Sequence, residues 1–225
     1  MRHSEHPHLA VHPSTQIRFA PVLHLHSGEP VLQIAETVRQ FDERPRFGPA
    51  FEAINQEALD PATWLADQIE DIAQMAHDEN DTRPIIVPLP VPSLLHPDTA
   101  MACDAALRRT PLCPQEICFE VSDAALTLAQ EEVHRGIEAL RRCGFRVSVD
   151  ATCSWQAPLS AALRLLLDNI RIDTRALEND AELEHRVEAA AASGMSVIAE
   201  HAAWRDADWL ADLGVEFAIR PRADA

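Results

Sequence analysis

Four acidic residues in the second half of the chain each end a short apolar run, and their type and spacing could serve metal chemistry. They are Glu120 in CFEVSD, Asp150 in VSVDA, Asp173 in RIDT and Glu200 in VIAEH. If the four runs are neighbouring strands, the carboxylates converge, and carboxylate oxygens are the ligands that Mg²⁺ prefers. Each could instead cap the helix that follows its strand, which is a purely structural role. Four in succession favour a common site.

The elements that would position these residues are strands alternating with helices. The hydrophobic periodicity predicts strands at residues 16–25, 29–38, 84–91, 115–123, 146–152, 169–174, 195–200 and 215–221. Helical spacing is predicted at residues 62–80, 99–109, 128–144, 158–167, 180–194 and 206–214. This alternation predicts an α/β fold, a (β/α)₈ TIM-type barrel that begins with an atypical hairpin. In such a barrel the C-terminal strand ends carry the chemistry.

Composition limits the classes of partner. The chain has 225 residues and a formal net charge of -17, which would repel phosphate backbones and anionic lipids, so we expect neither nucleic acid nor a membrane as partner. The five cysteines have no C-x-x-C spacing, and no secretion signal or membrane span is read, so a cytoplasmic location is expected. Residues 1–14 predict a flexible His-rich tail, and residues 15–225 one domain.

Six weakly kept segments carry a resemblance to a known family. They are FAPVLHLHSGEPV, CFEVSD, VSVDATCSW, the NIRID that follows it without a gap, MSVIAEHAAW and LADLGVEFAI. Their order and spacing from about Phe19 to the C-terminus resemble the EAL domain. That family hydrolyses cyclic di-GMP at a barrel mouth that holds two divalent metals. The resemblance implies the EAL kind of barrel and a degenerate form of its catalytic site.

Several positions that the resemblance assigns to metal ligands hold residues that cannot bind a metal through their side chains. The signature glutamate falls on Ile34, unless a slip of two residues places Glu36 there on the same strand face. An asparagine ligand falls on Pro88, which offers no ligand atom, and the paired aspartates become Asp150 and Ala151. Two-metal hydrolysis needs both cations held with a full ligand set. We therefore expect no catalytic residues and no cofactor.

The resemblance places Arg171 at the family's lysine. Glutamates are kept at Glu120 and Glu200, and a third glutamate position holds the shorter Asp123. A guanidinium stays protonated and forms planar forked pairs with carboxylates. We expect Arg171 to pair with Glu120, Asp150 or Glu200 and to replace the lost metal charge. These three carboxylates could hold at most one Mg²⁺, weakly. Asp173 is a further remnant position at the same predicted mouth.

The loop after Asp150 is also changed, because TCSWQAP contains a proline and none of the family's glycines. Trp155 in this loop is either core or a partner-facing anchor. In the predicted helix at residues 158–167, Leu165 and Leu167 lie off the stripe that would face the barrel. An interface through Trp155, Leu165 and Leu167, with a protein partner or a second copy, is therefore expected.

Three functions compete. The expected one is a catalytically inactive EAL-like domain that acts as a regulatory protein-interaction module in bacterial signalling. The alternative is a non-hydrolysing cyclic di-GMP receptor, for which Arg39 is a candidate phosphate ligand, displaced by one position from the family's arginine. An active phosphodiesterase is the least favoured function, because residues expected to bind the metals are missing.

Overall fold

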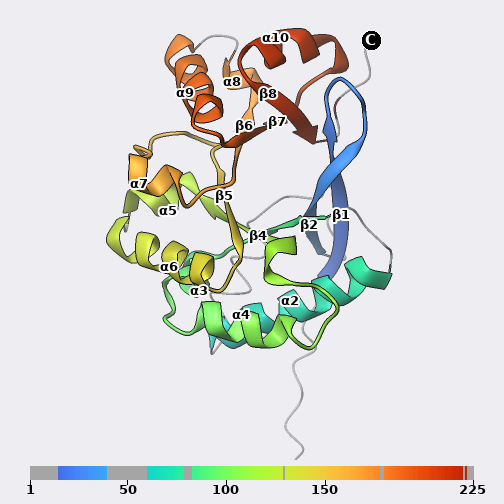
Figure 1. Cartoon of the computed structure of the whole chain (residues 1–225), viewed down its shortest axis with the longest axis vertical. Helices are drawn as coiled ribbons and strands as arrows, with labels where there is room; N and C mark the ends of the chain where they lie inside the picture. The colour runs from blue at the N-terminus through green and yellow to red at the C-terminus, as the bar shows by residue number, and fades with distance from the viewer. Residues whose placement is uncertain are drawn as a thin grey trace, which may run out of the picture.

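The computed structural model describes residues 15–39, 60–78, 83–128, 130–177, 180–219 and 221. The predicted tail at residues 1–14 lies outside them. Eight strands close into a barrel in chain order, with helices packed around it (Figure 1). The strands are β1 (Thr15–His24), β2 (Pro30–Arg39), β3 (Ile85–Pro88), β4 (Ile117–Ser122), β5 (Arg146–Asp150), β6 (Asn169–Asp173), β7 (Ser196–Glu200) and β8 (Val215–Ile219).

The barrel confirms the predicted fold, including its atypical start. β1 pairs antiparallel with both β2 and β8, whereas the remaining neighbours from β2 to β8 are parallel. Gly28 adopts φ +71° in the connection between β1 and β2, a conformation that favours glycine. The parallel strands from β3 to β7 therefore end at one rim of the barrel, as the strand-end carboxylates require.

The described helices cover the outside of this barrel (Figure 1). They are α2 (Pro61–Asp78), α3 (Val91–Leu95), α4 (Thr99–Leu107), α5 (Asp123–Leu128), α6 (Gln130–Arg142), α7 (Ala161–Arg164), α8 (Thr174–Leu177), α9 (Ala181–Ala192) and α10 (Ala207–Asp212), with short 3₁₀ turns at Pro114–Glu116 and Trp204–Asp206. Among these described helices, none is both long and apolar enough to cross a bilayer.

The helix predicted at residues 158–167 is much shorter than expected. α7 spans four residues and begins after Ser160, whose hydroxyl accepts a hydrogen bond from the backbone N–H of Leu163. The chain must then enter β6, and the backbone N–H of Asp168 already donates to the carbonyl of Val147 on β5. One helical turn is all that this short connection leaves room for. Similarly, the strand predicted at residues 84–91 ends at Pro88, and α3 follows.

Two layers of apolar side chains build the core. One fills the barrel interior and comprises Ala20, Val22, Leu32, Ile34, Ile86, Cys118, Ile198 and Ile219. The other, larger layer lies between the strands and the helices and includes Phe119, Val147, Ile69 and Leu163. Because successive strand side chains alternate between faces, the interior set identifies which residues point into the barrel.

A close contact between α3 and α6 yields a testable prediction. A Cβ built on Gly136 of α6 would lie 2.6 Å from the carbonyl oxygen of Leu94 and 2.8 Å from its Cδ1. Gly136→Ala should therefore lower the free energy of unfolding by about 1 to 2 kcal/mol, although alanine is the better helix former by about 1 kcal/mol. Urea denaturation measures this, with Gln130→Ala at an exposed position of α6 as the control. A stabilised Gly136→Ala variant would contradict the close packing.

Candidate functional site

The strand-end carboxylates come from four consecutive strands. Glu120 lies two residues after Cys118, and Glu200 two residues after Ile198, so both share the interior face of their strands. The strand register places Asp150 beside Arg171 and Asp173 beside Glu200. The predicted convergence at one rim of the barrel is therefore present.

Arg171 forms the centre of this rim. Its guanidinium makes a forked pair with Glu120, with Nε–Oε1 at 3.0 Å and Nη2–Oε2 at 2.6 Å. Nη2 also donates to Oδ2 of Asp150 at 2.7 Å, and Nη1 lies 3.3 Å from Oε2 of Glu200. The prediction that Arg171 pairs with these carboxylates is confirmed. We call Arg171, Glu120, Asp150 and Glu200 the Arg171 network.

The Arg171 network is deeply buried at its centre and more exposed to solvent at its edge. The side chains of Arg171 and Glu120 are each 2% exposed, whereas that of Asp150 is 28% exposed. Burial raises the pKa of Glu120 above its ordinary value, and the adjacent Arg171 charge opposes that rise. Burial alone would lower the pKa of Arg171, but Glu120, Asp150 and Glu200 together raise it. The guanidinium therefore stays charged and holds the three carboxylates together.

Asp173 is not part of the Arg171 network. Its carboxylate accepts hydrogen bonds from the side chain and backbone of Arg175, and Nδ1 of His201 lies 3.4 Å from its Oδ1. Burial would raise the pKa of Asp173, but the Arg175 hydrogen bonds and the nearby His201 lower it overall. His201 has φ 63°, a left-handed conformation that is unusual outside glycine. Asp173 thus belongs to a separate, more exposed pair at the same rim.

The two β2 residues to which the resemblance could assign the family's signature glutamate are both buried. Ile34 is fully buried in the apolar barrel interior. Glu36 is also buried and lies two residues further along β2 on the same face, nearer the rim. A role for Glu36 in place of the missing signature glutamate remains a prediction. The side chain of Arg39, the predicted phosphate ligand, lies outside the described part of the structure.

The residues at the rim do not fit the pair of divalent cations that the resemblance implies. Both carboxylate oxygens of Glu120 and one oxygen each of Asp150 and Glu200 face the Arg171 guanidinium. The side chains of Pro88 and Ala151 supply no ligand atoms. Across the described residues, no three His, Cys, Asp or Glu side chains are grouped so that they could hold a metal ion.

Asp123 has a role that the sequence did not reveal. Its buried carboxylate accepts hydrogen bonds from the backbone N–H groups of Gln156 at 2.8 Å and Ala157 at 2.9 Å, and from Oγ of Ser154 at 3.3 Å. Asp123 therefore fastens the loop after β5 to the end of β4. An aspartate directly after a buried strand was the available signal, but its partners lie more than 30 positions away.

The three predicted interface residues differ in exposure. Leu165 is 82% exposed, as an interface residue should be. Leu167 is only 6% exposed, so the prediction that it lies on the surface is wrong. Because α7 ends at Arg164, Leu167 turns into the core before β6 begins. Trp155 is half-buried against the core, and its carbonyl accepts a hydrogen bond from Arg186 at 2.6 Å.

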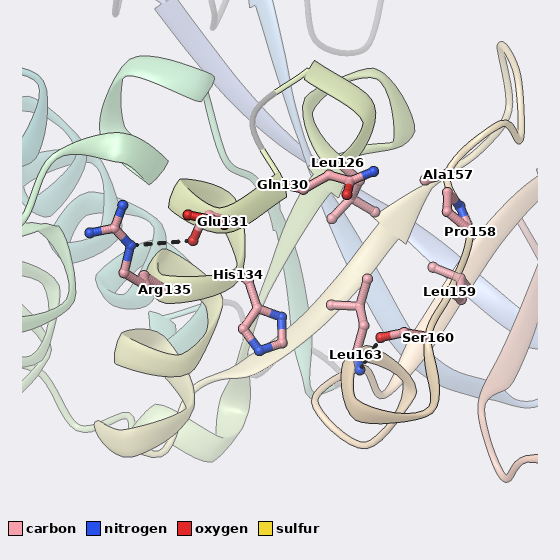
Figure 2. A pocket seen from close by; sticks show the side chains of 10 residues that line it. All are labelled: Leu126, Gln130, Glu131, His134, Arg135, Ala157, Pro158, Leu159, Ser160 and Leu163. Carbon is pink, nitrogen blue, oxygen red and sulfur yellow. Dashed lines mark hydrogen bonds between the residues drawn. The ribbon is translucent and has the colours of Figure 1, made fainter.

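A groove runs between α6 and the segment that leads into α7 (Figure 2). Its volume is about 600 Å³. Figure 2 shows α6 side chains along one wall and the segment around Pro158, Leu159 and Leu163 along the other. We call it the α6 groove, lined by Leu126, Gln130, Glu131, His134, Arg135, Ala157, Pro158, Leu159, Ser160 and Leu163. Periodicity cannot predict it, since its walls come from separate elements.

Comparison with solved structures gives the same fold. The PaMucR phosphodiesterase in complex with c-di-GMP is 19% identical, with a TM-score of 0.72 over 91% of this chain and 88% of that one. The FimX EAL domain is 18% identical, with a TM-score of 0.68 over 92% and 88%. BlrP1 of Klebsiella pneumoniae, complexed with calcium and cy-diGMP, is 18% identical, with a TM-score of 0.73 over 96% of this chain.

These likenesses, at such identities, establish the fold alone. The chain spans 56% of the BlrP1 chain and 60% of the EAL enzyme Bd1971. No curated protein matches the sequence. The family model of the EAL domain matches residues 14–219, which include all eight strands of the barrel. The chain therefore belongs to the EAL domain family.

Proposed function

We propose that this chain is a non-hydrolysing EAL domain that acts as a regulatory protein-interaction module in cyclic di-GMP signalling. The observation that carries the proposal is the Arg171 network. Its guanidinium is 2% exposed and paired with three carboxylates, at the position to which the resemblance assigns the family's lysine. A guanidinium does not give up its proton at neutral pH, and it cannot take the place of two hydrolytic metals.

The charge of the rim argues against tight binding of a dinucleotide with two phosphates. The carboxylates of Glu120, Asp150, Asp173 and Glu200 face two guanidinium groups, those of Arg171 and Arg175. These four carboxylates and two guanidinium groups leave a formal net charge of -2, which repels an anion. A cyclic di-GMP receptor is therefore the second candidate function. It is worth testing because two structures similar to this chain were solved in complex with that ligand.

The surface around the segment between β5 and β6 supports an interaction role. Leu165 presents an exposed large apolar side chain, and the α6 groove lies next to the same segment. Exposed apolar surface near a concave apolar site is typical of regions that associate with a partner. The partner could be another protein or a second copy of the chain.

Hydrolysis is the decisive test of the proposed function. Purified protein incubated with cyclic di-GMP and excess Mg²⁺ or Mn²⁺ should release no linear dinucleotide above the buffer blank, because the ligand set is incomplete. Chromatography of the products measures this, and an active EAL phosphodiesterase is the positive control. Product that forms at a catalytic rate and disappears in Glu200→Gln would refute the proposal. Calorimetric titration with cyclic di-GMP, with and without Mg²⁺, separates the receptor from the interaction module.

A further inference from the structure

We propose that the α6 groove binds the apolar face of a basic amphipathic helix supplied by a partner protein. The inference rests on the proposed interaction role and names the chemistry of the partner. Its starting point is the groove floor, where Leu126, Ala157, Leu159 and Leu163 line the cavity. A volume of about 600 Å³ is that of a pocket for a small molecule, so it can take a few apolar side chains of a helix.

The fold narrows the kinds of peptide that this groove could take. Strand addition needs a free sheet edge, and the described strands form a closed barrel without one. Proline-rich segments dock between aromatic side chains, but the residues lining the groove include no Phe, Tyr or Trp. Acidic or phosphorylated motifs need a cluster of arginines, and Arg135 is the one arginine among the lining residues. An amphipathic helix, which lays its apolar face into a hydrophobic groove, is the recognition mode that fits this lining.

Charge at the groove rim selects a basic helix. Arg135 pairs with Glu132, and His134 lies 3.3 Å from Glu138, so both already have acidic partners. Glu131 accepts a hydrogen bond from Nε of Arg135 at its backbone carbonyl, drawn in Figure 2, but its side chain makes no hydrogen bond or ion pair with any described residue. It offers a free carboxylate at the edge of an apolar floor, on a chain whose net charge is -17. A lysine or arginine beside the helix's apolar stripe would complement it.

A designed peptide tests the proposal on the full-length protein. The probe is a fluorescein-labelled 18-residue helix with leucine at helical spacing and lysine elsewhere, and fluorescence anisotropy measures its affinity. Glu131→Lys should weaken binding about tenfold, which corresponds to about 1.4 kcal/mol. Glu184→Lys is the matched control, because Glu184 is also acidic, lies in the first turn of a helix, and is absent from the groove lining. It should change the affinity less than twofold.

Two further peptides separate apolar from purely electrostatic binding. An alanine/lysine peptide keeps the charge but lacks the anchors, and a leucine/glutamate peptide keeps the anchors but reverses the charge. Both should bind at least tenfold more weakly than the leucine/lysine peptide. Equal losses in the Glu131→Lys and Glu184→Lys variants, equal binding of the three peptides, or no binding of the first peptide would overturn the proposal. Cyclic di-GMP hydrolysis is assayed on the same preparations: its appearance refutes the proposed function, whereas its absence without peptide binding refutes the groove alone.

Discussion

Replacing Arg171 with methionine is expected to lower the melting temperature by roughly 10 °C. Methionine fills similar space but removes the charge that holds Glu120, Asp150 and Glu200 together. Removing one partner of a buried ion pair costs about 3 to 5 kcal/mol, because the remaining charge stays buried without compensation. For a domain of this size, each kcal/mol shifts the melting temperature by about 2 to 4 °C. Differential scanning calorimetry measures the shift.

Arg175→Met provides the matched control. Arg175 is also an arginine paired with a carboxylate at the barrel rim, but its side chain is 63% exposed. Exposed pairs contribute about 0 to 1 kcal/mol, so this variant should melt within a few degrees of the wild type. If both variants melted at the wild-type temperature, the Arg171 network would have no structural role. Equal losses in both would show that burial is not the reason for the effect.

The second large effect is expected from Asp123→Ala. This change leaves the backbone N–H groups of Gln156 and Ala157 without their carboxylate acceptor. Ala157 is buried, so water replaces the lost partner poorly there. Hydrogen bonds to a charged group contribute about 1.5 to 3 kcal/mol each, so a loss of roughly 3 kcal/mol in unfolding free energy is expected. Hydrogen exchange at these two amides should also become faster, because the loop after β5 loses its attachment.

Asp180→Ala is the comparison for Asp123→Ala. Asp180 also accepts two backbone N–H groups, those of Glu182 and Leu183, but in an exposed cap of α9. Loss of such a cap costs typically ~1 kcal/mol. Chemical denaturation with amide exchange at Gln156 and Ala157 distinguishes the two variants. Unchanged exchange in Asp123→Ala would mean that packing of Trp155 and Ala157, and not the carboxylate, fixes the loop.

Patterns that are local in the chain were sufficient to predict the fold and part of the site. The alternation of apolar runs placed all eight strands, since each strand reflects the period of its own side chains. The same strand ends placed Glu120, Asp150 and Glu200 at one rim. The chemistry of a guanidinium was then enough to predict that Arg171 would pair with them.

Other features depended on how the tertiary structure places the side chains. Asp173 is bound to Arg175 and His201 and stays outside the Arg171 network, although its position on β6 looks equivalent in sequence. Leu165 and Leu167 belong to one leucine run, yet only the early end of α7 leaves the first exposed and the second buried.

The sequence by itself determined the barrel, the absence of ligand atoms in the side chains of Pro88 and Ala151, and the acidic strand ends that surround Arg171. These follow from residue type and from the periods of strands and helices. The tertiary structure alone decided the attachment of the loop to Asp123 and the α6 groove between two separate walls. Such hydrogen bonds and cavities form between segments that are far apart in the chain and are brought together only by folding. The local pattern of residue types therefore does not predict them.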